Sequence, residues 1–379
     1  MDTIIINLGM DVHTTNFTLC CYTLYNEKFF AETTVNPDYK EILKYLKNIE
    51  KAQKLSTGAA EVKFICGYEA GCLGYTLYHQ LTDAGYECKI LAPSTIPSFK
   101  TREIKTDKRD ARKIAQCLAF GTYSAVYIPT AEDLAVKEYI RMRDDHKSSL
   151  KRVKQQILAL CLRHGFQYKS SGSKKSYWTM AHIKFLREIR LEAYAQDALD
   201  EYLLTYNELS DKIERYDAKI EEIAKKEAYR EKVNKLQCFI GIRTYTALAI
   251  VVETGDFRRF ATADQYASYL GITPGERSSG DSRQRTGITH AGNSHIRKLL
   301  IEAAQGYGRG QIGYKSKALK AKQQGNPPEI ISYADRANTR LRKKYYNMIF
   351  NGKKANVAKT AIARELACFI WGMMTGHIA

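Results

Sequence analysis

The chain has 379 residues, of which 44% are hydrophobic, so it can hold two or three domains with their own cores and is neither collagen-like nor disordered. Its 59 Lys and Arg outnumber its 41 Asp and Glu, and the net charge of +18 favours a polyanionic partner, usually nucleic acid, with an anionic membrane as the rival. We find no signal peptide and no uncharged apolar run of about 18 residues, so a membrane protein is not expected. The nine cysteines form no Cys-x-x-Cys pair, which predicts buried reduced thiols, no zinc site and a cytoplasmic protein.

The first 125 residues are typical of an α/β domain. Short apolar or alternating runs predict strands at 3–9, 16–23, 28–35, 62–68 and 88–92. Helical spacing predicts helices at 37–52 and 72–84 and a last one that begins near Asp107. Three strands, helix, strand, helix, strand, helix is the order of a ribonuclease H-like domain, in which the first and fourth strands are neighbours.

Four acidic residues fall at the ends of these elements. Asp11 follows the first strand and Glu69 the fourth, while Asp107 and Asp110 share one face of the last helix. Together they would form the carboxylate set that one or two Mg²⁺ ions need for phosphoryl transfer. The cations around the last pair predict contact with a phosphate backbone; they include Lys105, Arg109 and Arg112. The alternative is that the acids are turn residues and that the pair only complements the helix dipole.

Residues 126–235 carry two long helical patterns. The first, at 132–164, is basic and has a seam of Leu150, Val153, Ile157 and Leu160. In the second, apolar residues alternate at spacings of three and four from Leu199 to Ile223, which predicts a coiled coil. We favour dimerisation through this seam, with an intrachain hairpin of the two helices as the alternative. No catalytic signal is present here.

The last third, 236–379, holds two motifs that suit phosphate binding. Residues 236–247 resemble a helix-hairpin-helix turn, in which amides at a helix N-terminus grip a phosphate, although Arg243 stands where a second glycine is usual. A Ser- and Gly-rich loop between helices then carries Arg277, Arg283 and Arg285 beside the hydroxyl of Ser279. No His/Asp pair stands nearby, so a hydrolase triad is not supported, and a flexible basic loop touching DNA is the alternative. The basic run 340–344 predicts a solvated helix face or, alternatively, phosphate contacts.

These motifs resemble those of a known family. Gly9-Met-Asp11-Val, Tyr68-Glu69-Ala-Gly-x-x-Gly74-Tyr and Lys105-Thr-Asp107-x-x-Asp110-Ala are similar to motifs of the DEDD-type transposases of bacterial insertion sequences, the one-ten / eleven-eleven group that includes the pilin-gene invertase. Gly-Ile-Thr-Pro at 271–274, Ser-Ser-Gly at 278–280, Gly-Ile-Thr-x-x-Gly-Asn at 287–293 and the trailing Arg297-Lys-Leu-Leu resemble the second conserved domain of that family. The likeness covers nearly the whole chain.

The resemblance implies a fold class and a domain plan. It implies an α/β ribonuclease H-like (RuvC-like) catalytic domain at 1–125, an α-helical coiled-coil dimerisation region at 126–235, and a mainly α transposase domain at 236–379. The metal-binding tetrad would be Asp11, Glu69, Asp107 and Asp110, and the nucleophile Ser279, with Ser278 as its alternative. Arg297 would join the other arginines in contacting nucleic acid.

It also implies an activity and partners. The chain would be an RNA-guided, site-specific DNA recombinase that uses Mg²⁺, or alternatively Mn²⁺, and forms a phosphoserine bond to DNA. Its partners would be donor and target DNA, a structured non-coding guide RNA (bridge RNA), and further copies of itself, as a dimer and as a tetramer on DNA whose shared sites combine domains of different protomers. Two alternatives stay open: a RuvC-like metal-dependent nuclease or junction resolvase that uses water, and a non-catalytic nucleic-acid-binding dimer.

Overall fold

The computed structural model describes residues 3–71, 73–93, 106–168, 177–279 and 282–378. They fall into two compact units, Met1–Ile128 and Pro129–Ala379.

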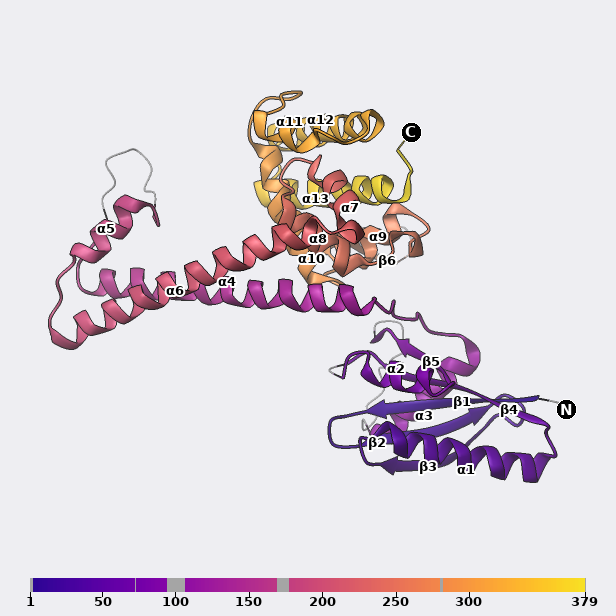
Figure 1. Cartoon of the computed structure of the whole chain (residues 1–379). Helices are drawn as coiled ribbons and strands as arrows, with labels where there is room; N and C mark the ends of the chain where they lie inside the picture. Colours follow the sequence, from indigo (N-terminus) through magenta and orange to yellow (C-terminus); the bar gives the residue numbers. More distant parts are fainter. Residues whose placement is uncertain (1–2, 72, 94–105, 169–176, 280–281, 379) are drawn as a thin grey trace. The chain divides into compact units, whose positions relative to one another are not determined.

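The first unit is built on a mixed five-stranded sheet (Figure 1). The strand order is β3-β2-β1-β4-β5, with β1, β2 and β3 paired antiparallel and with β1, β4 and β5 paired parallel. This confirms the predicted order of elements and the neighbouring first and fourth strands. The elements are β1 (Thr3–Val12), β2 (Phe17–Thr23), β3 (Lys28–Val35), α1 (Tyr39–Thr57), β4 (Glu61–Glu69), α2 (Thr76–Asp83), β5 (Glu87–Leu91) and α3 (Asp107–Phe120).

The two faces of this sheet are covered differently because side chains alternate along each strand. On one face, apolar residues of β1 and β4 such as Ile6 and Phe64 pack with α1 and α2. On the other face α3 lies directly against the backbone of β1: a Cβ atom added to Gly9 would be 2.1 Å from the carbonyl oxygen of Ala111 and 2.3 Å from the amide nitrogen of Ala115. Only glycine permits this approach, and it fixes the first turn of α3 beside the end of β1.

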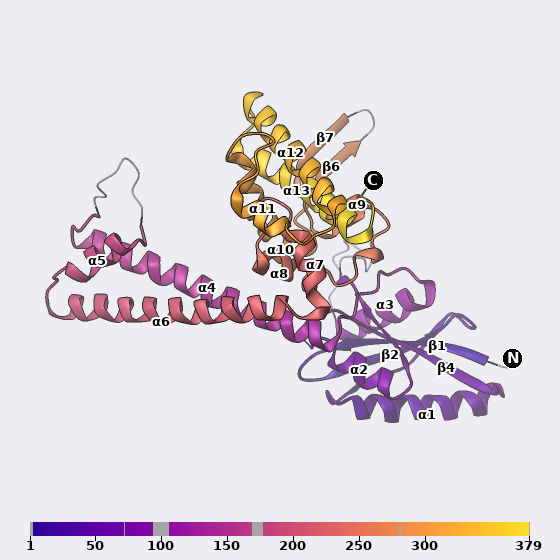
Figure 2. The same cartoon turned by 45° about the horizontal axis from the view of Figure 1, so that its top comes forward.

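The second unit is mainly helical, as predicted, with one β-hairpin that Figure 2 shows clearly. Its largest core gathers residues of α8, α9, α10, α12 and α13. The elements are α4 (Ala131–Arg163), α5 (Met180–Glu188), α6 (Ala193–Ala224), α7 (Glu227–Gln237), α8 (Thr244–Thr254), η2 (Phe257–Arg259), α9 (Ala263–Tyr269), β6 (Pro274–Ser279), β7 (Ser282–Ile288), α10 (Ser294–Ala304), η3 (Gln305–Gly308), α11 (Lys317–Gln323), α12 (Pro328–Phe350) and α13 (Ala355–Thr375).

The long helices α4 and α6 form the intrachain hairpin that was the alternative to a coiled-coil dimer (Figures 1 and 2). At one end Ile157 of α4 shares a buried cluster with Leu199 of α6, and at the other Ile140 of α4 shares a cluster with Ile220 of α6, so the helices run antiparallel. Since these seam residues are already buried within one chain, their spacing no longer favours a dimer. The oligomeric state stays a prediction.

Two expectations from composition can also be compared with the structure. The eight cysteines of the described ranges are free thiols, and seven of them are buried; Cys72 lies outside those ranges. Among the helices described, none has both the length and the apolar character that crossing a bilayer requires.

Candidate active site

The first two candidate acids lie on neighbouring parallel strands. Met10 of β1 pairs with Tyr68 of β4, so Asp11 and Glu69 are the next residues of the two strands. Both belong to the sheet face that α3 covers, because Gly9 and Gly67 of that face contact α3. The side chain of Asp11 is 16% exposed, whereas Glu69 is an exposed residue.

The other two acids come from the first turn of α3. Asp107 and Asp110 follow Thr106, which is the N-cap residue but makes no side-chain capping bond. Asp107 is exposed and Asp110 half-buried. Their negative charge is favourable at this end of a helix, so the same two residues stabilise the turn that presents them.

A histidine that the sequence analysis did not single out completes this group. The Nε2 atom of His13 lies 3.2 Å from Oδ2 of Asp11 and 4.0 Å from Oδ1 of Asp107. One possible ligand atom from each of these three residues lies within 4.8 Å of the other two. The signal was the spacing Asp11-x-His13, because residues two apart in extended chain point to the same side.

The electrostatics of the group suit a divalent cation. Burial raises the pKa of Asp11, and so does repulsion from Asp110 and Asp107, while His13 lowers it. A bound cation would relieve this repulsion, and carboxylate oxygens are the ligands that Mg²⁺ and Mn²⁺ prefer. The structure thus brings Asp11, His13 and Asp107 into one compact group. Asp110 lies near enough to repel the charge of Asp11, and Glu69 is adjacent in register, but neither belongs to that group.

The cations predicted around these acids differ in their surroundings. Arg112 forms a two-pronged ion pair with Glu32 of β3, in which Nη2 is 2.8 Å from Oε2 and Nε is also bonded, and this pair holds the pKa of Glu32 below its usual range. Because Glu32 already neutralises Arg112 in part, we expect Arg112 to bind a phosphate less strongly than the sequence suggested. Arg109 is exposed, and Lys105 lies outside the described residues.

The Ser- and Gly-rich stretch is a β-hairpin, so its prediction as a loop was wrong. Ser279 pairs with Ser282 and Ser278 with Arg283, while Arg277 pairs with Gln284. The strands are almost entirely polar, so the sequence showed no alternation of apolar residues that would predict them. They are recognised by their backbone pairing. The hairpin gathers the two serines and the predicted arginines, including Arg285, on one two-stranded ribbon; residues 280–281 lie outside the described part.

The base of this ribbon is held by close backbone contacts. A Cβ atom at Gly271 would lie 1.9 Å from the carbonyl oxygen of Ala291, and one at Gly292 would lie 1.9 Å from that of Tyr269. Arg297 donates from Nη1 to the carbonyl oxygens of Leu270, at 2.8 Å, and Ala291, at 3.1 Å. The structure thus gives Arg297 a structural role at the base of the ribbon, and its predicted contact with nucleic acid stays a prediction.

Comparison with known proteins now identifies the kind of protein. A family model described as Transposase IS116/IS110/IS902 family matches residues 233–311, and a DEDD transposase model of the IS110 group matches residues 8–166. The chain is 34% identical over 326 residues to the putative transposase y4qE of Sinorhizobium fredii, covering 86% of this chain and 78% of that protein. It is 31% identical over 353 residues to the transposase for insertion sequence element IS1533 of Leptospira borgpetersenii, covering 92% and 97%.

The chain belongs to the IS110 family of transposases. It is therefore a DNA-cleaving and rejoining enzyme that binds DNA, and the non-catalytic alternative is set aside. A DEDD-type domain implies the use of a divalent metal, with which the acidic group at the end of β1 agrees.

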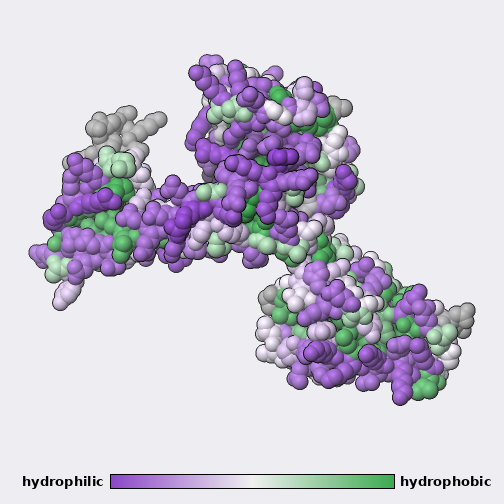
Figure 3. Space-filling model, viewed as in Figure 1, coloured by the Kyte–Doolittle hydropathy of each residue, from purple (hydrophilic) through white to green (hydrophobic). Residues whose placement is uncertain are grey.

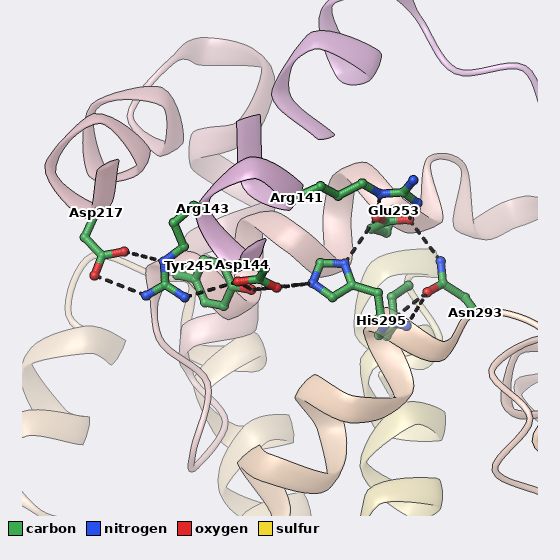
Figure 4. A network of polar contacts seen from close by, with 9 residues as sticks. Arg141, Arg143, Asp144, Asp217, Tyr245, Glu253, Asn293 and His295 are labelled. Atoms are coloured by element: carbon green, nitrogen blue, oxygen red, sulfur yellow. Dashed lines mark hydrogen bonds and ion pairs between the residues drawn. The ribbon is translucent and has the colours of Figure 1, made fainter. Parts of the chain in front are cut away.

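The transposase also contains a buried polar network that the sequence did not reveal (Figure 4). His295, in the first turn of α10, lies between two carboxylates: its Nε2 is 2.8 Å from Oδ2 of Asp144 on α4, and its Nδ1 is 3.2 Å from Oε1 of Glu253 on α8. The hydroxyl of Tyr245 donates to Asp144 at 2.6 Å. Asn293, the N-cap residue of α10, donates to Oε2 of Glu253 at 3.0 Å.

This network makes His295 a cation rather than a base. Burial alone would lower its pKa, but hydrogen bonds to Asp144 and Glu253 raise it to about 9. Burial opposes the ionisation of Asp144, yet hydrogen bonds from His295 and Tyr245 lower its pKa to about 2. Since both ring nitrogens donate to carboxylates at neutral pH, this pair does not act as the base of a hydrolase triad. Instead it joins the start of α10, just after the ribbon, to α4 and α8.

Proposed function

We propose that this transposase is an RNA-guided, site-specific DNA recombinase of an insertion sequence and that it links itself covalently to DNA through Ser279. The observation that carries the metal-dependent part is the group of Asp11, His13 and Asp107 at the end of β1, with the charge of Asp110 acting on Asp11 beside it. In this proposal residues 1–125 are a ribonuclease H-like (RuvC-like) catalytic domain, 126–235 a helical region that contains the hairpin of α4 and α6, and 236–379 the transposase domain with the nucleophile.

The acidic residues would hold the divalent ion. Asp11, Asp107 and Asp110, with Glu69 from the next strand and His13 in contact, provide its ligands, and Mg²⁺ is the proposed ion, with Mn²⁺ as the alternative. When bound, the ion supplies positive charge that polarises a phosphate and stabilises the departing oxygen.

The β6–β7 ribbon would supply the nucleophile. The hydroxyl oxygen of Ser279 forms a bond to phosphorus, the bond from phosphorus to the departing sugar oxygen breaks, the serine proton is lost to a base, and the departing oxygen takes up a proton. Arg277, Arg283 and Arg285 belong to the same ribbon and would offset the phosphate charge. The reverse reaction with another strand end rejoins DNA and frees the serine. Ser278 is the alternative nucleophile.

The partners proposed are donor and target DNA, a structured guide RNA and further copies of the chain. A net charge of +18 suits a protein that contacts two polyanions. Base pairing with an RNA would choose the DNA sites and leave the protein to recognise backbone and shape. A dimer, and a tetramer on two DNAs, would let the serine of one protomer act with the acids of another.

Denaturing electrophoresis tests this proposal. Purified protein is mixed with labelled element-junction DNA, RNA from the flanking non-coding region and Mg²⁺. We expect a slow, protease-sensitive DNA band for the wild type and for Ser278→Ala, its matched control, and none for Ser279→Ala or Asp107→Ala. A full-strength band in Ser279→Ala would refute the nucleophile, and the same band without RNA would refute the guide.

A metal-dependent nuclease that uses water is the second candidate. It is favoured by one observation: all the ligands of the acidic group lie in the first unit, which contains neither of the two serines of the ribbon. Cleavage without an attached protein, kept in Ser279→Ala and lost in Asp107→Ala, would decide for it.

A further inference from the structure

A strongly basic cavity of about 490 Å³ lies in the second unit, between the turn that joins α7 to α8, the segment after η3, and α11 and α12. Four cations line it, namely Arg243, Arg309, Lys322 and Arg342, and none of its lining residues is acidic. The visible face of the unit around α11 and α12 is mostly hydrophilic (Figure 3). We call this cavity the arginine pocket.

Arg342 is the most unusual of these residues because it is buried and forms no ion pair with an acidic side chain of the described ranges. Only 6% of its surface is exposed, although the sequence placed it in a solvated basic run. Its Nη1 atom donates to the carbonyl oxygens of Gln311, at 2.6 Å, and Tyr314, at 3.0 Å, while its buried Nε atom has no hydrogen-bond partner in the described structure. A buried guanidinium that lacks a carboxylate is costly unless an anion binds to it.

Lys322 adds a second charge at the same place. Its Nζ atom donates to the carbonyl oxygen of Ile242 at 3.0 Å, at the end of the turn. Burial lowers the pKa of Lys322, and repulsion from Arg243 lowers it further, whereas Glu221 opposes this change. Lys322 and Arg243 thus lie close enough to repel each other, and an anion bound between them would offset this repulsion.

The turn itself is closely packed and hydrogen-bonded. Gly241 has φ +84°, and a Cβ atom there would lie 2.2 Å from the carbonyl oxygen of Ala303. The buried side chain of Asn338 accepts a hydrogen bond from the amide of Ile240 at 3.0 Å and donates to the carbonyl oxygen of Cys238 at 3.0 Å. The turn leads into α8, which begins without a side-chain cap, so its first amides remain suited to an anion.

We propose that the arginine pocket binds a backbone phosphate of the nucleic acid that the transposase handles. Fork-shaped guanidinium groups, an ammonium group and the start of a helix are the donors that recognise phosphate oxygens. DNA and RNA offer the same phosphate group, so the experiment has an arm for each. The inference uses the DNA binding of the family and is independent of Ser279 and of RNA guidance.

The test is binding affinity as a function of salt concentration, measured by fluorescence anisotropy without divalent ion so that no cleavage occurs. The ligands are element-junction duplex DNA and RNA from the flanking non-coding region. The variants are Lys322→Met and Arg342→Lys, and Lys343→Met is the matched control because Lys343 is an exposed neighbour on the same helix. Thermal unfolding of each variant shows whether it is folded.

We expect Lys322→Met to weaken binding of at least one nucleic acid by roughly tenfold and to reduce the salt slope by about one unit for duplex DNA, while Lys343→Met changes affinity less than about twofold. Arg342→Lys keeps the charge but loses the fork, so we expect a loss of about threefold or more. A loss with DNA only, or with RNA only, assigns the phosphate to that nucleic acid.

If Lys322→Met and Arg342→Lys bind both nucleic acids as tightly as Lys343→Met does, the proposal is overturned. Inorganic phosphate provides a further arm: at constant ionic strength it should raise the melting temperature of the wild type more than that of Lys322→Met. Stabilisation by phosphate with unchanged binding of both nucleic acids would show an anion site that no backbone phosphate occupies, which also overturns the inference.

Discussion

Asp144 and His295 are 151 residues apart in the chain, yet an oxygen of one and a ring nitrogen of the other lie 2.8 Å apart. The contact ties the middle of the long helix α4 to the first turn of α10. Glu253, whose side chain is fully buried, completes it from α8 and also pairs with Lys137 at 3.2 Å. One imidazolium and two carboxylates thus hold together α4, α8 and α10, which are far apart in the sequence.

This network predicts a pH dependence of stability. The pKa of His295 is raised from 6.5 to about 9, so its stabilising contribution is complete below pH 6.5 and is lost as the pH rises through about 9. We expect the free energy of unfolding to fall between pH 6 and pH 9.5 by on the order of 2 kcal/mol more in the wild type than in His295→Gln. Urea titrations measure this, and parallel pH profiles of the two proteins would contradict it.

Asp144 of the same network predicts a pH dependence of stability in the opposite direction. The pKa of Asp144 is lowered from 3.8 to about 2, so its contribution is present above pH 3.8 and is lost as the pH falls through about 2. Asp144→Asn should therefore be less stable than the wild type at pH 6, and the difference should shrink as the pH approaches 2. A constant difference across this range would argue against the network.

Gly9 should not tolerate even one additional carbon. Because a Cβ atom there would overlap the backbone of α3, Gly9→Ala should lower the free energy of unfolding by about 3 kcal/mol or more and weaken binding of divalent ions. Gly71→Ala is the control, since its Cβ would lie 3.8 Å from the nearest atom. Equal stability of the two variants would show that α3 does not pack on β1 in this way.

His13 should distinguish between divalent ions. Both ions prefer carboxylate oxygens, but Mn²⁺ accepts an imidazole nitrogen more readily than Mg²⁺ does, so His13→Ala should weaken Mn²⁺ binding by roughly tenfold and change Mg²⁺ binding less. Asp107→Asn should weaken both. Calorimetric titration of the protein without nucleic acid measures the two affinities, and an unchanged Mn²⁺ affinity in His13→Ala would remove this residue from the site.

The seam between α4 and α6 should stabilise the single chain. Ile157 is fully buried in it, so Ile157→Ala should lower the free energy of unfolding by about 2–4 kcal/mol without changing the mass in sedimentation experiments. Leu204→Ala, at a position of α6 that is 51% exposed, should change stability by less than about 1 kcal/mol. If Ile157→Ala, but not Leu204→Ala, becomes more monomeric than the wild type, the coiled-coil dimer is again the better interpretation of this seam.

The parts of the fold that could be predicted are those that produce a local pattern of apolar residues in the sequence. A nearly continuous apolar run revealed β1, two short runs separated by a turn at Asn26 revealed β2 and β3, and the pairing of β1 with β4 followed from the order of elements. The acids Asp11, Asp107 and Asp110 could be placed together because each stands at the end of an element. The ribbon of Ser279 was missed because polar strands carry no apolar period.

Other features depend on contacts between distant residues, which no local pattern encodes. The charges of His295 and Glu253 are visible in the sequence, but their pairing needs the packing of α8 against α10. The heptad spacing of α6 was real, yet spacing alone does not tell whether the covering helix belongs to the same chain. Arg342 belongs to a basic run that looked solvated, yet it is buried and donates to the carbonyl oxygens of Gln311 and Tyr314, which are about 30 residues away in the chain.

The base of the β6–β7 ribbon has a consequence for how such proteins diversify. Gly271, Gly292 and Arg297 make their contacts outside the two strands, and Ile288 at the end of β7 packs against the main core, so the base of the ribbon is held by residues other than Ser279 and the arginines of its strands. Substitutions of Ser279 or of those arginines therefore leave the residues that make these contacts unchanged. The ribbon is accordingly a natural unit for exchange between relatives, in evolution or by grafting in the laboratory.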